Sequence, residues 1–421
     1  MAKQQNNGQE QDVNQLRKVR RDKLAELQQN GRDPFQITKF DQTHHSLEVK
    51  DLYEAHEAEL LKDHQEPNVE GMDEEQAKEA LKKDYEERRS IMDANPIHVA
   101  IAGRMMFKRV MGKASFCNIQ DLQGNIQVYV ARDAIGTDSY ADFKKSDIGD
   151  IFGLEGFAFR TRTGEISIHA EKMTLLSKSL QMLPEKFHGL TDKETRYRQR
   201  YVDLIVNPEV KRNFVIRSQF IKHLRDYLDN MGYIEVETPV LNTIAGGAAA
   251  RPFITHHNTL DIDMYMRIAT ELPLKRLIVG GMDRVYEVGR IFRNEGMDPK
   301  HNPEFTTVEL YQAYADFHDM MDIAEGVYTT FAQKYLGTYE LEWMGETVDL
   351  TPGWPRLTMI EAVKKYVGID FGAISDDAEA VAAAKAVGVE LADAAEKTWG
   401  NALYACFDQK VEEQLVQPTF I

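Results

Sequence analysis

The sequence predicts an α+β protein in which a small β-barrel precedes a larger domain of sheet and helices. Three observations lead to this fold class. After Asn95-Pro96 a segment rich in Glu, Lys and Ala gives way to short segments that alternate as strands do. Residues 220–231 repeat apolar side chains at helical spacing ahead of a strand. Residues 290–311 predict a strand, a charged loop and a second strand.

Composition limits the class of protein. With 421 residues, 43% of them hydrophobic and 28% charged, the chain is expected to fold as a globular protein of two or three domains. It has no apolar run near the ~18 residues of a membrane helix, and its N-terminus lacks the apolar stretch of a secretion signal. Cys117 and Cys406 form no CxxC pair, which favours a reducing cytoplasm over a cysteine-bound zinc site.

The net charge is a weaker guide to the function of the protein. Lys and Arg number 51 against 68 Asp and Glu, which leaves a net charge of −17. Such a balance argues against a protein coated with nucleic acid but leaves room for a local basic face.

Residues 1–95 are predicted to form an N-terminal helical extension. A helix is expected at 14–30, with leucines and Val19 on one side and a crowd of Arg and Lys on the rest. Two interpretations of this basic helix stay open: an RNA-contacting appendage, or a solvated face of a helix packed on the body. Residues 51–93 are predicted to form surface helices, and we assign them no catalytic or binding role.

Residues 96–183 carry about five candidate strands in about 80 residues. Their sequences are HVAIAGRMMF, ASFCNIQDL, NIQVYVAR, DIFGLEGFAFR and ISIHAEKMTLL. This pattern favours an OB-type barrel, whose usual ligand is single-stranded nucleic acid. Phe116 and Gln127, on the second and third candidate strands, supply a ring to stack a base and an amide to read its edge. For Phe116 alone, core packing is the alternative.

The stretch RIFRNEGMDPKHNPEFTTVELY at 290–311 is the most informative. Because strands alternate faces, Val308 and Leu310 are expected on a buried face and a ring, a carboxylate and a phenol on the other. In the first strand Arg293 shares its parity with Glu287, and we expect the two to lie close together. An arginine, a ring and acids predict a site for a nucleotide and a cation. The alternative is an ordinary hairpin with a salt-bridged tip.

Two motifs here resemble a known family. Phe292-Arg293-Asn294-Glu295 followed by His301-Asn302-Pro303-Glu304-Phe305 resembles the second signature motif of class II aminoacyl-tRNA synthetases. The longer run RNEGMDPKHNPEFTTVELYQAYAD is similar to the lysyl-tRNA synthetases in particular. The amphipathic helix and the strand ending at Pro239 resemble the first class II motif, which implies a homodimer.

The resemblance implies an OB-fold anticodon-binding domain at 96–183, a linker at 184–210 and a class II catalytic domain at 211–421. That domain would be an antiparallel sheet of six strands flanked by helices, with a helical insertion at about 356–413. The implied reaction activates L-lysine with ATP to lysyl-adenylate and transfers it to the 3′ end of tRNA-Lys, with Mg²⁺ bridging phosphate oxygens.

The resemblance also assigns residues. Arg293 would bridge the lysine carboxylate and the α-phosphate of ATP, so it is the catalytic candidate and part of both substrate sites. The other ATP-binding candidates are Glu295, His301, Asn302 and Phe305. The other lysine-binding candidates are Gly247, Glu271, Glu309 and Tyr311. The anticodon-binding candidates are Phe116, Gln127, Arg109 and Glu165. For Glu271, a surface glutamate that caps a helix is the alternative.

The chain also departs from the family pattern. No GxGxGxxR stretch, the third class II motif, is present. The chain stops at QLVQPTFI, which we expect to be a strand, so the sequence is predicted to be C-terminally incomplete. The family's remaining acids, including its metal ligands, are expected beyond Ile421, and none is predicted within the chain.

Three alternatives follow. A truncated, inactive tRNA-binding or regulatory protein would keep the barrel and lose catalysis. A lysine ligase that modifies a translation factor would lack the barrel, so residues 97–180 count against it. Within class II, an aspartyl or asparaginyl enzyme is the one most easily mistaken for a lysyl enzyme.

Overall fold

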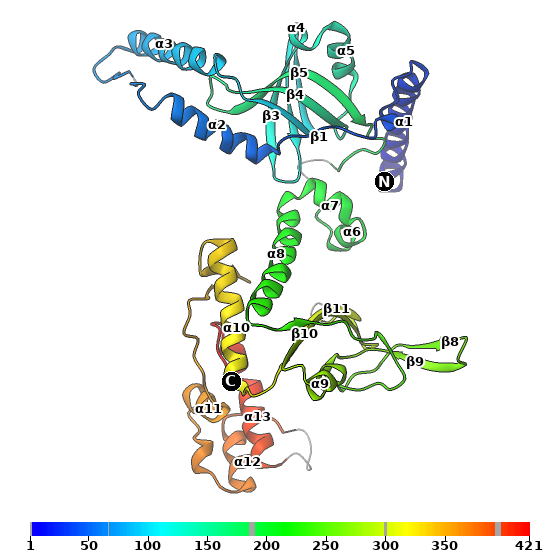
Figure 1. The fold of residues 1–421 in the computed structure, drawn as a ribbon, viewed down its shortest axis with the longest axis vertical. Coiled ribbons are helices and arrows are strands. Elements are labelled where there is room, and N and C mark those ends of the chain that lie inside the picture. The colour runs from blue at the N-terminus through cyan, green and yellow to red at the C-terminus, as the bar shows by residue number, and fades with distance from the viewer. Residues whose placement is uncertain (1, 66, 185–189, 299–300, 392–396) are drawn as a thin grey trace. The chain divides into compact units, whose positions relative to one another are not determined.

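A computed structural model describes residues 2–65, 67–184, 190–298, 301–391 and 397–421. Parts of the predicted linker and helical insertion, residues 185–189 and 392–396, lie outside these ranges. The chain forms two compact units, Met1–Arg212 and Asn213–Ile421, which are described separately (Figure 1). Within the described ranges no helix is both long and apolar enough to cross a membrane.

The first unit is built on a closed five-stranded barrel with the order β1-β2-β3-β5-β4. Its strands are β1 (His98–Met111), β2 (Ala114–Gln120), β3 (Asn125–Ala131), β4 (Ile151–Arg160) and β5 (Ile166–Ser177). Alternate side chains such as Cys117, Ile119 and Val128 are fully buried inside it. The short helices α4 (Arg132–Ile135) and α5 (Thr137–Lys145) join β3 to β4. The predicted barrel is confirmed.

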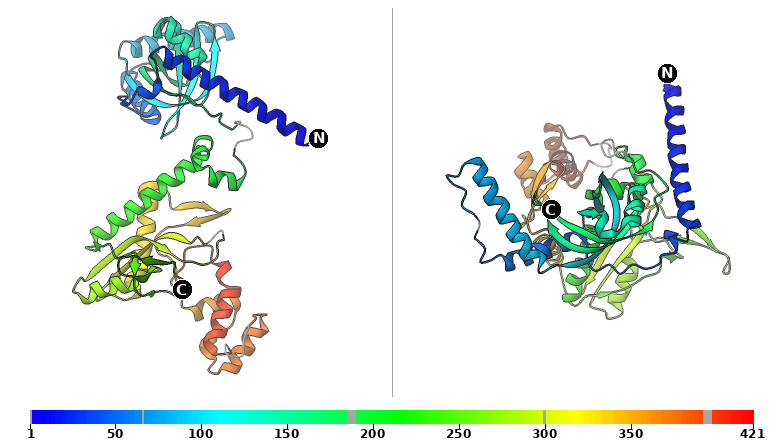
Figure 2. Two further views of the ribbon diagram at one scale, coloured as in Figure 1. Left: turned by 90° about the vertical axis from the view of Figure 1, so that its right-hand side faces the viewer. Right: turned by 90° about the horizontal axis from the view of Figure 1, so that it is seen from above.

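Helices precede the barrel, as predicted: α1 (Ala2–Gln29), η1 (Pro34–Gln36), α2 (Ser46–Leu60) and α3 (Glu74–Asp93) (Figure 2). Basic side chains of α1 attach this helix to the barrel. Arg20 donates hydrogen bonds to the carbonyl oxygens of Ser179 and Gln181, at 3.0 and 2.8 Å. Lys23 pairs with Asp147 at 2.7 Å. These contacts favour the packed helix of the two interpretations, and RNA contact stays open for the exposed Lys18 and Arg21.

Helices α6 (Lys193–Arg198), α7 (Arg200–Val206) and α8 (Pro208–Asn230) follow the barrel. Helix α8 contains the predicted amphipathic segment and ends before Gly232, whose φ of +80° suits a glycine after a helix.

The second unit contains a sheet with the order β11-β10-β6. Strands β10 (Arg284–Phe292) and β11 (Glu304–Gln312) are antiparallel and in register from Arg284 opposite Gln312 to Phe292 opposite Glu304. Their even-numbered side chains, including Tyr286, Val288 and Leu310, belong to a core cluster with α8 and α10 (Phe317–Phe331). The strand–loop–strand prediction is confirmed. Of the two residues expected on the buried face, Leu310 packs on the core, whereas Val308 is 37% exposed, so that expectation was wrong for Val308.

The sheet differs from the implied six antiparallel strands. In the part that the structure describes it has three, and β6 (Ile234–Glu235) is parallel to β10. The strand expected from Tyr233 onward is short: it ends at Glu235, and the Thr238 N–H donates to the side chain of Glu287 at 3.2 Å. The chain then enters a separate antiparallel sheet of β7 (Leu241–Asn242), β9 (Ile262–Met266) and β8 (Ile254–His257), and the β8–β9 hairpin projects from its unit (Figure 1).

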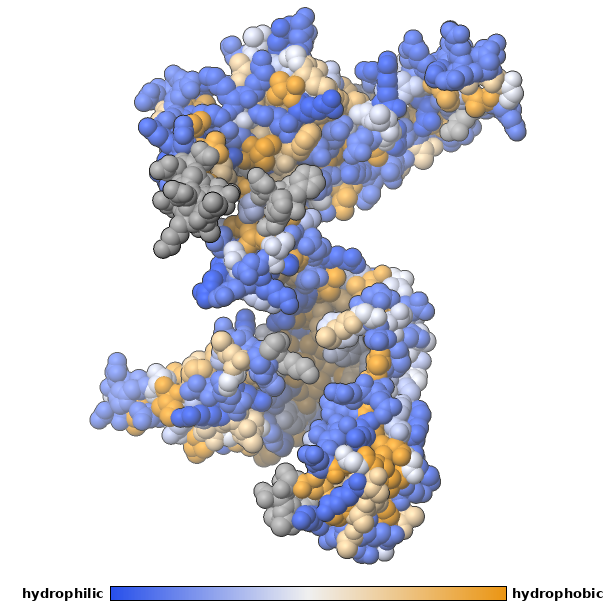
Figure 3. Space-filling model, turned by 180° about the vertical axis from the view of Figure 1, so that it is seen from behind, coloured by the Kyte–Doolittle hydropathy of each residue, from blue (hydrophilic) through white to orange (hydrophobic). Residues whose placement is uncertain are grey.

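The predicted helical insertion forms its own hydrophobic cluster from α11 (Met359–Val367), α12 (Asp377–Ala386) and α13 (Trp399–Lys410). Apolar side chains reach the surface over this part of the chain (Figure 3). A hairpin of β12 (Glu340–Trp343) and β13 (Glu346–Asp349) precedes it. The strand expected at the end of the chain is reduced to one parallel bridge between Arg356 and Phe420.

The prediction that Arg293 and Glu287 lie close together was wrong, and Glu287 instead belongs to a buried ion pair. Six residues along a strand span about 20 Å, so shared parity alone cannot bring these two together. Glu287 instead pairs with Arg267, and the two are 3% and 7% exposed. The Thr238 hydroxyl donates to Glu287 at 2.7 Å, and Arg267 Nε donates to the Arg290 carbonyl at 2.8 Å.

Removal of one partner of this pair tests its role in stability. Arg267→Met leaves a buried carboxylate without its cation and is expected to lower the free energy of unfolding by about 3–5 kcal/mol. The three tryptophans (Trp343, Trp354 and Trp399) all lie in the second unit, so their fluorescence in urea reports on this unit alone. Arg225→Met, which opens the more exposed Arg225–Glu235 pair, is the control and is expected to cost about 0–1 kcal/mol. Equal losses for the two variants would contradict the prediction.

Candidate functional site

Arg293 and Phe305 lie together at the loop end of the β10–β11 pair. The Arg293 main-chain N–H donates to the Pro303 carbonyl at 2.8 Å, and its side-chain Nε donates to the Ile268 carbonyl at 3.4 Å. The guanidinium carbon is 5.3 Å from the centre of the Phe305 ring, within the range of a cation–π contact. A purine that stacks on Phe305 would therefore lie close to the positive charge of Arg293.

The other ATP-binding candidates lie in the loop between the two strands and are exposed. The Glu295 carboxylate accepts a hydrogen bond from the Arg251 N–H at 3.4 Å. His301 contacts Asp298 through Nδ1 at 2.7 Å, and the Asn302 amide donates to the Glu304 carbonyl at 2.8 Å. The structure thus places Glu295 beside the small-residue loop that ends at Arg251. The described contacts of His301 and Asn302 are local.

Glu309 and Tyr311 form an acidic site farther along β11. Glu309 accepts hydrogen bonds from the Thr270 N–H at 3.0 Å and from the Tyr311 hydroxyl at 3.3 Å. Burial, followed by the charges of Glu309 and Glu271, raises the pKa of Tyr311 to about 12. The phenol therefore keeps its proton at neutral pH and can donate to a carboxylate.

Glu271 and Gly247 border this acidic site. Glu271 is the first residue of α9 (Glu271–Val279), directly after Thr270. Gly247 has a φ of +89°, and a Cβ there would lie 3.3 Å from the Cβ of Glu271 and 3.1 Å from that of Ala269. Its backbone therefore approaches the start of α9 as only a glycine can without strain. The structure brings together all four of these lysine-binding candidates: Gly247, Glu271, Glu309 and Tyr311.

In the described part of the chain, no group of three or more His, Cys, Asp or Glu side chains could hold a metal ion. The residues present therefore do not form a magnesium site by themselves. The predicted Mg²⁺ stays a prediction without assigned ligands.

The anticodon-binding candidates lie on adjacent strands of the barrel. Arg109 of β1 is opposite Phe116 of β2, and Gln127 of β3 is opposite Asn118 in the next row. The Ser167 hydroxyl of β5 donates to the Gln127 side-chain oxygen at 3.0 Å. Glu165 is exposed in the turn that leads into β5. A ring, an amide and a positive charge therefore share one face of the barrel.

Sequence reasoning missed further aromatic residues in the row of Phe116. Its cross-strand neighbour Tyr129 is 5.2 Å away between ring centres, and Tyr129 is 5.2 Å from His169. His169 in turn stacks on Phe157 at 4.9 Å, and burial lowers its pKa. Alternation along NIQVYVAR and ISIHAEKMTLL could have placed these rings outside the barrel, but only the register shows that they adjoin. The functional role of Arg267 was also missed, although the position of an arginine directly after a strand was a signal that could have identified it.

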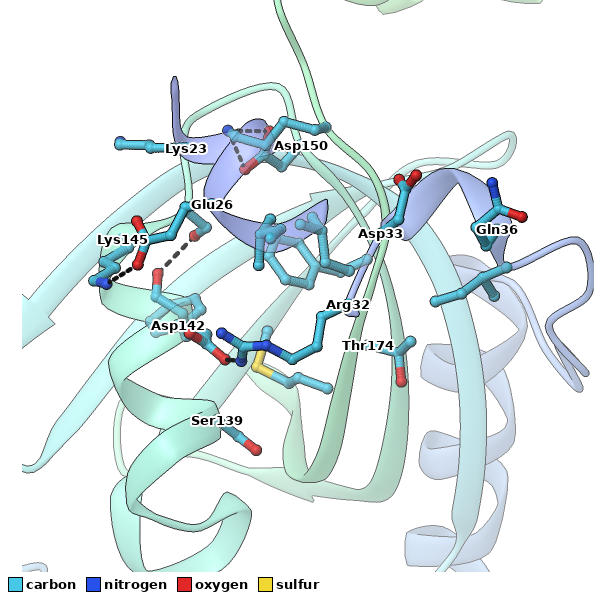
Figure 4. Close-up of a pocket in the computed structure, with 18 of the residues that line it drawn as sticks. Lys23, Glu26, Arg32, Asp33, Gln36, Ser139, Asp142, Lys145, Asp150 and Thr174 are labelled. Carbon is cyan, nitrogen blue, oxygen red and sulfur yellow. Dashed lines mark hydrogen bonds and ion pairs between the residues drawn. The ribbon is translucent and has the colours of Figure 1, made fainter. Parts of the chain in front are cut away.

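The first unit also holds a cavity of about 500 Å³ between the end of α1, helix α5 and strands β4 and β5 (Figure 4). Charged side chains that line it are already paired: Arg32 with Asp142, Lys145 with Glu26 at 3.0 Å, and the buried Lys178 with Asp150 at 2.9 Å. Burial alone would raise the pKa of nearby Asp147, but hydrogen bonds from Lys178 and Lys23 hold it below its ordinary value. The residues that line this cavity belong to neither predicted site, and we assign the cavity no role.

Comparisons with known proteins agree with this geometry. Residues 192–420 match the family described as class II tRNA synthetases (D, K and N), and residues 99–176 match the OB-fold nucleic acid binding domain. The chain is 49% identical to proteins named lysine–tRNA ligase from Thermoanaerobacter sp. (strain X514) and Clostridium botulinum (strain Loch Maree / Type A3). The first match covers 97% of this chain and 74% of the relative, the second 100% and 77%.

A lysine–tRNA ligase from Staphylococcus aureus (strain Mu3 / ATCC 700698) is also 49% identical, over 97% of this chain and 76% of the relative. The family match covers more than half of the chain, and it includes Arg293 and the strand that carries Phe305 and Glu309. The chain therefore belongs to the class II tRNA synthetases of the D, K and N group, with an OB-fold domain ahead of the synthetase domain.

Proposed function

We propose that the protein is a lysine–tRNA ligase, which activates L-lysine with ATP and transfers it to the 3′ end of tRNA-Lys. The observation that carries this proposal is the 49% identity to several lysine–tRNA ligases over nearly the whole chain. The acidic site at Glu271, Glu309 and Tyr311 supports it, because a dibasic amino acid needs a partner for its side-chain ammonium. The alternative of an inactive tRNA-binding protein is not favoured, since the relatives are named as ligases.

The proposed chemistry joins two anions. The carboxylate of lysine, ionised at neutral pH, attacks the α-phosphate of ATP and expels pyrophosphate, so no general base is needed. Catalysis then rests on placement and charge neutralisation. Arg293 would lie between the two reactants and bind both through its planar guanidinium, while Phe305 below it stacks on the purine. Glu295, His301 and Asn302 are the proposed further contacts to ATP, and Mg²⁺ would neutralise phosphate charge when bound.

Specificity for lysine would come from the acidic site. Glu271 and Glu309 are proposed to receive the ammonium groups of lysine, and Tyr311 to donate a hydrogen bond to Glu309 and so fix that carboxylate. Gly247 would let the loop backbone close over the amino acid. Bound substrate would cover these partly exposed acids. An acid covered without an ammonium partner is costly, so neutral analogues would be rejected strongly, on the order of 10⁴-fold.

The barrel would read the anticodon. Phe116 is proposed to stack on an unpaired base and Gln127 to read its edge, with Arg109 and Glu165 beside flanking nucleotides. The domain division at 96–183, 184–210 and 211–421 is proposed on the same basis.

We also propose that the protein is a homodimer of the cytoplasm. Several apolar side chains of the second unit are exposed, with Ile244, Ile254 and Leu260 each more than half exposed near the β8–β9 hairpin. Such a surface favours a partner. Both cysteines are buried and free, which suits a reducing compartment.

Replacement of Arg293 tests the proposed chemistry. Arg293→Ala is expected to lower lysine-dependent ATP–pyrophosphate exchange by at least about 100-fold, because the charge that develops in the transition state loses its neutralising partner. Arg290→Ala is the matched control, since Arg290 is exposed on β10, three residues before Arg293 and at the opposite parity. Near-normal exchange in Arg293→Ala would exclude the proposed role.

Replacement of Glu309 tests the proposed lysine site. Glu309→Gln removes a charge that would pair with an ammonium and is expected to raise the KM for lysine by at least about 30-fold, with a smaller effect on the KM for ATP. Glu304→Gln, at the exposed start of the same strand, is the control. An unchanged KM for lysine in Glu309→Gln would remove this residue from the site.

Replacement of Phe116 tests the proposed anticodon site. Phe116→Ala is expected to weaken binding of a tRNA-Lys anticodon stem-loop by about 1–3 kcal/mol, the usual contribution of one base stacked on an aromatic ring. Fluorescence anisotropy measures this, and pyrophosphate exchange is expected to stay normal. Phe35→Ala, at an exposed ring on η1, is the control. Equal affinities for the two variants would show that Phe116 only packs.

A further inference from the structure

A lysine of the chain itself reaches the acidic site. The Nζ of Lys275 is 2.5 Å from the Oε1 of Glu271 and 5.8 Å from the centre of the Tyr311 ring. Lys275 lies on α9, one helical turn after Glu271. Its ammonium therefore contacts two of the residues proposed to bind the lysine substrate.

The chemistry of this contact is that of the substrate. Lys275 presents a primary ammonium on four methylene groups, the same group that distinguishes lysine from neutral amino acids. The acids around it act together: the charges of both Glu309 and Glu271 contribute to the raised pKa of Tyr311. Glu309 is already held by Thr270 and Tyr311, so Glu271 is the acid that takes the internal cation.

We propose that the ammonium of Lys275 occupies the site at Glu271 when substrate is absent. This inference rests on the proposed function. The internal ammonium keeps Glu271 compensated in the empty site, so the acid is not left unpaired. A lysine substrate brings its own ammonium and can take over Glu271 from Lys275.

The strength of the pair suits such an exchange. The side chains of Lys275 and Glu271 are 54% and 34% exposed, and ion pairs this open to water are weak. The substrate can therefore displace Lys275 at a small cost in affinity. A tighter, fully buried pair would exclude the substrate.

A simpler role would also produce this contact. A glutamate four residues before a lysine on a helix is a common pair that stabilises the helix slightly. The two roles differ in one measurable respect. If Lys275 competes with the substrate, its removal raises the affinity for lysine; if it only supports α9, its removal leaves that affinity unchanged or lowers it.

The test titrates L-lysine into the protein by isothermal calorimetry. Lys275→Met keeps the length of the side chain and removes its charge, and we expect it to bind lysine about two- to five-fold more tightly than the wild type. Lys275→Arg keeps a cation within reach of Glu271 and is expected to bind like the wild type. Arg276→Met, which removes the same charge from an exposed neighbour on α9, is the matched control and is expected to change nothing.

In pyrophosphate exchange the same effect appears as a lower KM for lysine in Lys275→Met at an unchanged kcat. Unchanged or weaker binding of lysine by Lys275→Met would overturn the inference and leave the proposed function intact. An equal gain in Arg276→Met would also overturn it, because general charge and not occupancy would then be the cause. A wild-type protein that binds no lysine would overturn the proposed function and this inference with it.

Discussion

The antiparallel register of β10 and β11 determines which side chains can act together. Because Ile291 is opposite Phe305, and Glu287 is opposite Glu309, all odd-numbered side chains of the two strands share one face. The even-numbered face is fixed by its core contacts with α8 and α10. A slip of one residue would carry Glu309 into that apolar core and expose Leu310. The hydrophobic packing of one face therefore holds the polar residues of the other in place.

On the polar face, charges of opposite sign lie at separate positions. The cation of Arg293 lies over Phe305 near the loop, and the carboxylates of Glu309 and Glu271 lie farther along. Between them the Arg267 guanidinium passes so close to Gly289 that a Cβ there would lie 2.3 Å from Nη2. Arg267 is neutralised by Glu287, so it contributes little net charge. An amino acid with an anionic carboxylate at one end and an ammonium at the other matches this separation of charge.

Local patterns in the sequence were enough to predict much of this arrangement. Period-two alternation predicted the strands of the barrel and the core-facing position of Leu310 on β11 but not the exposure of Val308, and the motif around Arg293 predicted most of the site. Contacts between distant segments could not be predicted in the same way. The Arg267–Glu287 pair joins residues of two different sheets, and the ring row from Phe116 to His169 depends on the pairing of three strands. The parallel pairing of β6 and its early end at Glu235 are likewise tertiary features.

The central claim is that lysine and ATP meet on the odd-numbered face of β11, with Arg293 between them. A crystal structure of the protein with L-lysine and a non-hydrolysable ATP analogue tests this most directly. We expect the purine on Phe305, the lysine carboxylate and the α-phosphate within hydrogen-bond distance of Arg293, and an ammonium of lysine on Glu271 or Glu309. Ligands bound elsewhere, or an Arg293 side chain that contacts neither reactant, would contradict the claim.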